Sequence, residues 1–153
     1  EGDEEDRVRL VQVATPEMIY LIDMHVMFRN PTKEEKKKLG EALALALFQP
    51  APTVSNPLLV GFAVSGDVKA LHPYTSPHMH KLERQRVVVD VKTHPKVTAH
   101  LKASGRSKKD FTSLAKMTEC FYGKGLGKLW TMSDWSKRPL LPGQIEYAAL
   151  DAW

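Results

Sequence analysis

Residues Ser133–Trp153 read SDWSKRPLLPGQIEYAALDAW, and this stretch is the most informative in the chain. Its second half is rich in alanine and contains no breaker after Gly143, which predicts a helix with Pro142 in its first turn. Tyr147 and Asp151 are four residues apart on that helix and therefore share one face. A core tyrosine beside a solvated acid gives the same spacing, so the spacing alone leaves the function open.

The composition is that of one globular domain. The chain has 153 residues, of which 42% are hydrophobic and 26% charged, which is long enough for one core and short for two. No apolar run approaches the roughly 18 residues that span a bilayer, so we expect no membrane partner. The single cysteine, Cys120, cannot form an internal disulfide. These features predict an intracellular protein, cytoplasmic or nuclear.

The charge is unevenly distributed along the chain. Residues 1–6 hold five acids and no base, which predicts an acidic loop or linker. The remaining residues carry 22 bases against 13 acids. This excess of positive charge favours a polyanionic partner such as a nucleic acid.

Two β-rich runs, Val8–Ala14 and Met18–Met24, are separated by a short turn that contains Pro16, which predicts an antiparallel pair. Thr32 and Glu35 are then spaced as a capping box and predict the start of an amphipathic helix. We expect its apolar face to contain Leu39, Leu43, Ala46 and Leu47. The opposite lysine cluster at residues 33–38 is typical of a solvated face, with an RNA-binding site as the alternative.

The run Leu58–Val64 is almost continuously apolar and predicts a buried strand. Asp67 follows it, where a helix through Leu71 begins. A carboxylate at this end of a buried strand lies at the edge of an α/β sheet that usually bears the functional site. The alternative is that Asp67 only caps the helix.

Beyond this point the chain gives weaker signals. Residues 86–91 predict another strand, in which we expect Asp90 to be structural, and residues 93–109 predict a flexible surface segment. A helical stripe from Phe111 ends at Gly123. Three histidines lie among prolines without a cysteine pair or regular ligand spacing, which favours loop histidines over a zinc site. They are His72, His78 and His80.

The block S-D-W-x-x-R-P-L at Ser133–Leu140, followed by Q-x-x-Y-A-A-x-D-A at Gln144–Ala152, resembles the third motif of the DEDDy 3'-5' exonucleases. Within that family it is most similar to the ribonuclease D, Werner exonuclease and Nibbler branch. The pattern V-G-F-x-x-x-G-D-x-x-x-L at Val60–Leu71 resembles the second motif of the Nibbler exoribonucleases. The resemblance implies a ribonuclease H-like α/β fold, a mixed sheet flanked by helices.

The resemblance also implies a reaction. Four acids would hold two divalent ions, Mg²⁺ or Mn²⁺, about 4 Å apart for phosphodiester hydrolysis, and Asp67 and Asp151 match two of these acids. Tyr147 would orient the attacking water. Lys128 and Arg138 are candidates for nucleic-acid binding, and for Arg138 the recurrence of Arg-Pro-Leu in the family favours the role of ordering the turn beside Trp135.

The implied substrate is the 3' end of single-stranded RNA, with DNA as the alternative and protein partners in a small-RNA trimming or silencing pathway. A non-catalytic exonuclease-like domain that binds RNA or protein is a different possibility. A metal-independent DNA-binding module has little support, because no recognition-helix or zinc-finger pattern is present.

The first motif of the family, a D-x-E inside a hydrophobic central strand, has no clear match. Asp3-Glu4-Glu5 has the letters, but nothing apolar precedes Asp3. Arg9–Ala14 matches the strand that follows this motif in the family. We therefore expect the exonuclease domain, residues 7–153, to be incomplete at both ends, with its central strand upstream.

Overall fold

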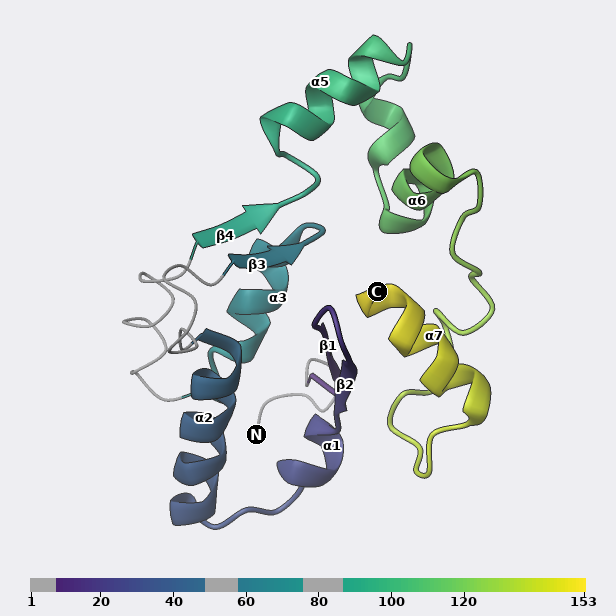
Figure 1. The fold of residues 1–153 in the computed structure, drawn as a ribbon. Coiled ribbons are helices and arrows are strands. Elements are labelled where there is room, and N and C mark those ends of the chain that lie inside the picture. Colours follow the sequence, from purple (N-terminus) through teal and green to yellow (C-terminus); the bar gives the residue numbers. More distant parts are fainter. Residues whose placement is uncertain (1–7, 49–57, 76–86) are drawn as a thin grey trace. The chain divides into compact units, whose positions relative to one another are not determined.

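The computed structural model describes residues 8–48, 58–75 and 87–153, and Figure 1 labels their helices and strands. The chain divides into two compact units, which are described separately. The first unit combines Glu1–Asn30 with Ser113–Trp153, and the second is the middle of the chain, Pro31–Thr112. The acidic segment at residues 1–6, which contains Asp3 and Glu5, lies outside the described residues.

The first unit contains an antiparallel hairpin of β1 (Val11–Ala14) and β2 (Ile19–Ile22). The Thr15 N–H donates a hydrogen bond of 2.8 Å to the Met18 carbonyl oxygen and closes the turn between them. The pairing predicted for these two runs is thereby confirmed.

The second of these runs is shorter than predicted because a helix begins within it. Met24 is the first residue of α1 (Met24–Met27), and Asp23 precedes it as the N-cap. The Asp23 carboxylate accepts a hydrogen bond of 3.0 Å from the Val26 N–H. This contact satisfies one of the N–H groups that a helix start leaves without an internal partner, which favours the helix over a longer strand.

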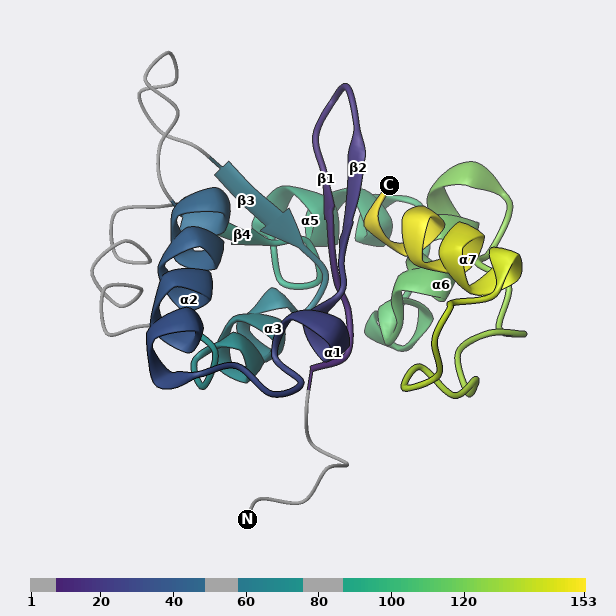
Figure 2. The ribbon, with the colours of Figure 1, turned by 90° about the horizontal axis from the view of Figure 1, so that it is seen from below.

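The other helices of the first unit are α6 (Leu114–Tyr122) and α7 (Pro142–Ala152). α6 ends at Gly123, whose φ of 70° lies in the left-handed region that glycine adopts without strain, so the predicted stop is confirmed. α7 begins at Pro142, as predicted. It contacts both strands of the hairpin, as Figure 2 shows, and its Ala148 is fully buried.

The second unit begins with α2 (Lys33–Phe48), and its predicted capping box is confirmed. The Thr32 N–H donates to Glu35 Oε2 at 2.8 Å, and the Glu35 N–H donates to Thr32 Oγ1 at 3.3 Å. The buried face differs from the prediction, since Ala46 is exposed. The buried residues are Gly40, Leu43, Ala44, Leu47 and Phe48.

A close backbone contact accounts for the difference between the predicted and the observed buried face of α2. A Cβ atom at Gly40 would collide with the Tyr74 carbonyl oxygen, so the absence of a side chain allows the two backbones to pass closely. The helix therefore turns Gly40 inward. The lysine cluster at residues 33–38 is exposed, as expected of a solvated face.

The strands of the second unit are β3 (Leu58–Gly61) and β4 (Val87–Asp90), which pair in parallel. The strand predicted to continue to Val64 ends at Gly61, because a turn through Phe62 and Ala63 leads directly into α3 (Val64–Leu71). Burial also differs from the prediction. Val60 is 53% exposed, whereas Val64, Val68 and Leu71 of α3 are buried.

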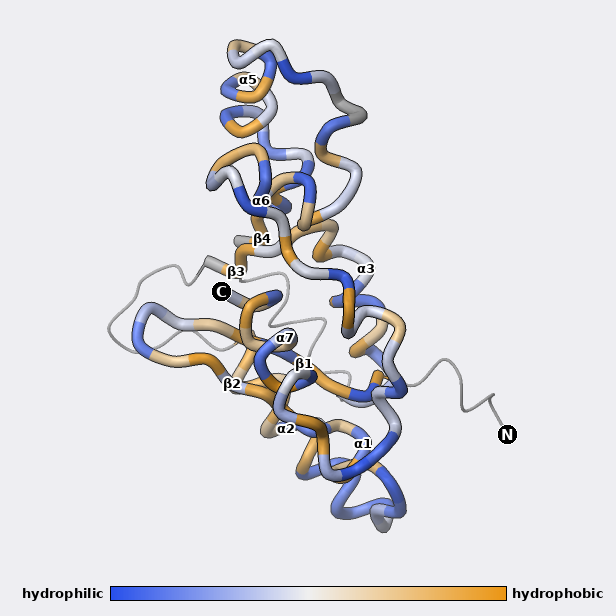
Figure 3. The backbone as a smooth tube through the Cα atoms, turned by 90° about the vertical axis from the view of Figure 1, so that its right-hand side faces the viewer, coloured by the Kyte–Doolittle hydropathy of each residue, from blue (hydrophilic) through white to orange (hydrophobic). Residues whose placement is uncertain are grey.

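The segment predicted to be a flexible surface region contains the helix α5 (Pro95–Ala103). Pro95 occupies the first helical turn, where its missing N–H is tolerated. Leu101 is only 2% exposed and anchors the helix. Hydrophilic and hydrophobic residues follow one another along α5 in Figure 3. The prediction failed because one buried leucine among charged residues is a weak periodic signal. A 3-10 helix, Lys108–Phe111, follows.

The described residues thus form two two-stranded sheets, one antiparallel and one parallel, together with helices. This is a mixed α/β architecture, as predicted. Among the helices of the described residues, none has the length and apolar character needed to cross a membrane.

Candidate active site

The tyrosine and aspartate of α7 share one face, as predicted. Burial raises the pKa of the Asp151 carboxyl above its ordinary value, and a hydrogen bond from the Tyr147 hydroxyl opposes that rise in the pKa. Both side chains are partly exposed, so water reaches them. The pair therefore consists of a carboxylate that is costly to ionise and a phenol that stabilises its charged form.

The Tyr147 hydroxyl has a second partner that the sequence analysis did not identify. Thr131 Oγ1 lies 3.2 Å from it. Because the tyrosine proton is directed to Asp151, the threonine hydroxyl is the donor in this contact. The ring of Tyr147 also packs against Trp135, with the ring centroids 6.1 Å apart and the planes tilted by 46°. The phenol is thus held at both its hydroxyl and its ring.

Gln144 connects the first turn of α7 to the S-D-W block. Its side chain is almost fully buried, at 3% exposure. The Leu141 N–H donates to its Oε1 at 2.9 Å, and its Nε2 donates to Ser133 Oγ and to the Asp134 carbonyl oxygen, each at 3.1 Å. These contacts satisfy the side-chain amide of Gln144, which would be costly to bury without hydrogen-bond partners. Gln144 therefore fixes the start of the helix that carries Tyr147 and Asp151.

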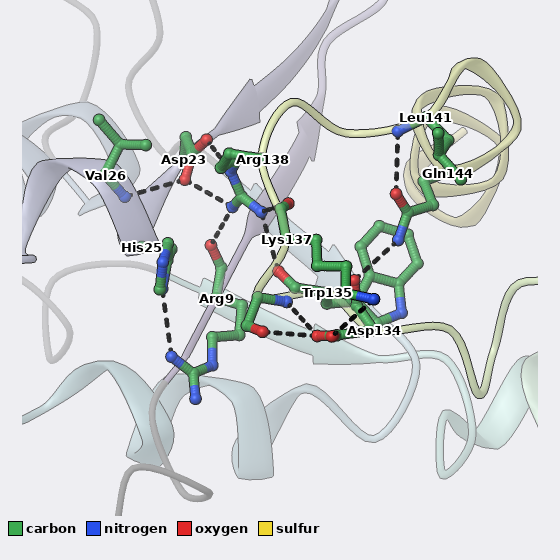
Figure 4. Close-up of polar contacts among 11 residues, drawn as sticks. Arg9, Asp23, His25, Val26, Asp134, Trp135, Lys137, Arg138, Leu141 and Gln144 are labelled. Carbon is green, nitrogen blue, oxygen red and sulfur yellow. Dashed lines mark hydrogen bonds and ion pairs between the residues drawn. The ribbon is translucent and has the colours of Figure 1, made fainter.

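Arg138 makes polar contacts with other residues of the first unit (Figure 4). Its guanidinium forms an ion pair with the Asp23 carboxylate, and it donates to the carbonyl oxygens of Trp135 at 2.9 Å and Lys137 at 2.7 Å. Nη2 also lies 3.4 Å from the Arg9 carbonyl oxygen. These contacts fit the role of ordering the turn beside Trp135, and a phosphate contact by Arg138 stays a prediction.

Asp67 lies in the first turn of α3 and is exposed to solvent. It does not cap this helix, because the N-cap residue is Ala63. Protein atoms that displace water around the carboxyl raise the pKa of Asp67, and the negative charge of Asp90 raises it further. Two acids of the second unit are therefore close enough to repel each other.

The predicted site residues fall in both units of the chain. Tyr147 and Asp151 belong to the first unit, together with Lys128, which is exposed, and Asp67 belongs to the second. Convergence of Asp67 with Asp151 stays a prediction. Within residues 8–48, 58–75 and 87–153, no three His, Cys, Asp or Glu side chains are gathered in a metal-binding group. Of the candidate loop histidines, His78 and His80 lie outside those ranges.

Some of the residues that hold this site left a signal in the sequence and others did not. Gln144 is the third residue of a helix that begins with Pro142, a position where glutamine or glutamate often bonds back to the N-cap N–H. Thr131 lies in a loop of the first unit without regular periodicity, and no spacing rule links it to Tyr147.

Comparisons with known proteins agree with these observations. A sequence model of a protein family described as 3'-5' exonuclease matches residues 2–153. The human exonuclease mut-7 homolog is 24% identical over 151 residues, which are 96% of this chain and 17% of the human protein. The crystal structure of the Aedes aegypti Nibbler EXO domain matches with a TM-score of 0.65 and 25% identity, covering 95% of this chain and 65% of that one. The fold is accordingly ribonuclease H-like.

Proposed function

Because the chain belongs to the 3'-5' exonuclease family, we propose that it removes nucleotides from the 3' end of single-stranded RNA by a hydrolysis that depends on divalent metal ions. RNA is favoured over DNA by the similarity of the Val60–Leu71 motif to the Nibbler exoribonucleases. The same similarity favours a role in trimming or silencing small RNAs. The chain spans 17% of the human relative, so these proposals concern the exonuclease domain.

The observation that carries the proposal is the arrangement around Tyr147. Its hydroxyl is held between Thr131 and Asp151, and its ring packs on Trp135. A fixed phenol next to a carboxylate is suited to orienting a water molecule for attack on a phosphate. Tyrosine has an ordinary pKa of about 10, so positioning suits it better than acting as a base at neutral pH.

The carboxylates fit divalent metal ions by their chemistry. Mg²⁺ and Mn²⁺ prefer oxygen ligands with negative charge, which Asp67 and Asp151 provide. Partial displacement of water raises the pKa of both carboxyls, and the charge of Asp90 adds to this effect at Asp67, so a nearby cation would relieve the cost of ionising either group. When bound, the ions would lower the pKa of a water molecule and shield the charge of the phosphate.

The other residues of the first unit have supporting roles in this proposal. Lys128 is exposed and is the candidate for contacting a substrate phosphate. Arg138 positions the loop that carries Trp135, through its ion pair with Asp23.

The direct test is cleavage of single-stranded RNA and DNA labelled at the 5' end. We expect products that shorten stepwise from the 3' end with Mg²⁺ or Mn²⁺ and no cleavage with a chelator. Products of internal cleavage, or equal activity with chelator, would contradict the proposal. Binding of RNA without cleavage under all metal conditions would instead support the alternative of a non-catalytic RNA-binding domain.

A further inference from the structure

Asp90, the last residue of β4, holds the turn that leads from β3 into α3. Its Oδ1 accepts a hydrogen bond of 2.9 Å from the Ala63 N–H and another of 3.0 Å from the Lys92 N–H. The Ala63 contact is partly buried and joins residues 27 positions apart. The strand register places Asp90 opposite Gly61, so the carboxylate is at the level where β3 ends.

The residues that follow Asp90 contact the same turn. The Val91 N–H donates to the Gly61 carbonyl oxygen at 2.8 Å, and Lys92 Nζ lies 5.6 Å from the centroid of the Phe62 ring. Three successive residues, Gly61, Phe62 and Ala63, are thus each contacted by Asp90 or by one of the two residues that follow it. The turn is fixed from the neighbouring strand.

This turn needs such support because of its backbone conformation. Ala63 has a φ of 55°, and among the residues that the structure describes it is the only non-glycine residue with a positive φ. The left-handed conformation strains a residue that has a Cβ atom. Ala63 is also the N-cap of α3 and has no side chain that could bond to the helix. The Asp90 carboxylate supplies an acceptor for its N–H, which favours this conformation.

We propose that Asp90 is a positioning residue for Asp67. By fixing Ala63 in the left-handed conformation, it sets where α3 begins, and Asp67 lies in the first turn of that helix. This inference rests on the proposed function, in which Asp67 holds a metal ion. Asp90 would act through its hydrogen bonds, since its Oδ1 accepts from the N–H groups of Ala63 and Lys92.

Two substitutions distinguish a positioning role of Asp90 from a role of its negative charge. Asp90→Asn keeps an oxygen that can accept from Ala63 and removes the negative charge, whereas Asp90→Ala removes the acceptor. Groups that orient metal ligands typically contribute 10- to 100-fold to metal affinity. We therefore expect Asp90→Ala to raise the half-saturating Mn²⁺ concentration by about 10- to 100-fold, and Asp90→Asn by less than about 3-fold.

The experiment uses the purified full-length protein and two measurements. The first is a Mn²⁺ titration of RNA hydrolysis, and the second is hydrogen exchange of the metal-free protein across residues 61–67. Asp90→Ala should lose exchange protection at the Ala63 amide, and Asp90→Asn should retain it. Glu34→Ala, on the exposed face of α2, is the matched control that removes a carboxylate elsewhere in the same unit and should change neither measurement.

Several results would overturn the inference. One is unchanged Mn²⁺ dependence of the Asp90→Ala protein when the Asp67→Asn protein is inactive. Another is an equal rise of the half-saturating Mn²⁺ concentration in Asp90→Asn and Asp90→Ala, which would indicate that the negative charge of Asp90 is what matters. If Asp67→Asn itself remains fully active, the proposed function fails, and the exchange data still report on the turn. If Asp90→Ala unfolds, it is combined with Ala63→Gly, since glycine adopts a positive φ freely. We expect the double variant to fold and still show the weakened Mn²⁺ dependence.

Discussion

The Asp23 carboxylate and the Arg138 guanidinium form a bidentate ion pair between residues 115 positions apart in the chain. Arg138 Nη2 donates to Asp23 Oδ1 at 2.6 Å, and Nε donates to Oδ2. The same aspartate caps α1 through the Val26 N–H. One carboxylate therefore connects the end of the hairpin to the loop that carries Trp135, and Trp135 packs on Tyr147.

Loss of this ion pair should reduce stability in a way that depends on pH. The hydrogen bond from Arg138 is the largest cause that lowers the pKa of Asp23. A lowered pKa in the folded state stabilises the protein above the ordinary aspartate pKa of 3.8, and this stability is lost as the pH falls through the lowered pKa. We expect Asp23→Asn to lower the free energy of unfolding by about 1.5 to 3 kcal/mol at pH 7.

Urea unfolding at pH 7 and at pH 3 measures this effect. The difference between the wild-type protein and Asp23→Asn should shrink at the lower pH. Glu34→Gln is the control, because its ion pair with Lys38 joins two exposed side chains and should change stability by less than about 0.5 kcal/mol. A difference that is the same at both pH values would show that the charge of Asp23 does not matter.

Substitutions on the shared face of α7 should affect hydrolysis unequally. Asp151→Asn keeps the shape of the side chain but removes the charge that would hold a metal ion. Loss of a group that only orients a metal ligand typically costs up to roughly 100-fold, so we expect turnover to fall by more than this. Tyr147→Phe removes only the oriented hydroxyl, and we expect a smaller loss of about 10- to 100-fold, as is typical of groups that orient others at a metal site. Both are measured as initial rates on 5'-labelled RNA, and wild-type turnover by a folded Asp151→Asn protein would exclude the proposed role.

The parts of the fold that could be predicted are those with local signals. Pro142 and the alanine-rich run after it specify α7, and Thr32 with Glu35 specifies the start of α2. Gly123 specifies the end of α6. Each of these signals acts through hydrogen bonds or dihedral angles within a few residues, so it can be recognised in the sequence without knowledge of the tertiary structure.

The parts that could not be predicted depend on contacts between distant residues. The strand before Asp67 ends early because of the turn at Ala63, which Asp90 holds from another strand. Arg138 resembles a phosphate-binding residue in the sequence, and only the tertiary structure brings it to Asp23. The shared face of Tyr147 and Asp151 followed from helical spacing, but no such rule identifies Thr131 as the partner of the phenol.

Thr131 should contribute to hydrolysis through Tyr147. Thr131→Val keeps the volume of the side chain and removes the hydroxyl 3.2 Å from the phenol oxygen. A single hydrogen bond contributes about 0.5 to 1.5 kcal/mol, so we expect turnover to fall roughly 2- to 10-fold, with Thr131→Ser retaining wild-type turnover. In a Tyr147→Phe background the Thr131→Val change should have no further effect. An additive loss in the double variant would mean that Thr131 acts independently of Tyr147.

Removal of the Asp67 charge should stabilise the metal-free protein while it abolishes hydrolysis. Displaced water and the Asp90 charge raise the pKa of Asp67 above 3.8, so the ionised group opposes folding at all pH values above the raised pKa. As the pH falls through the raised pKa, folded Asp67 becomes protonated and this cost is relieved. Solvent screens the exposed carboxylate, so we expect Asp67→Asn to gain at most about 0.5 kcal/mol at pH 7 and nothing at pH 3.

Thermal unfolding with and without Mn²⁺ tests whether Asp67 binds the metal ion. A cation that binds only the folded state raises the unfolding temperature by mass action. Wild-type protein should therefore unfold at a higher temperature with Mn²⁺ than with chelator, whereas Asp67→Asn should show little difference between the two conditions. Glu34→Gln should respond to Mn²⁺ like the wild-type protein, because Glu34 is on the exposed face of α2. An equal rise in the unfolding temperature of all three proteins would show that Asp67 does not hold the metal ion.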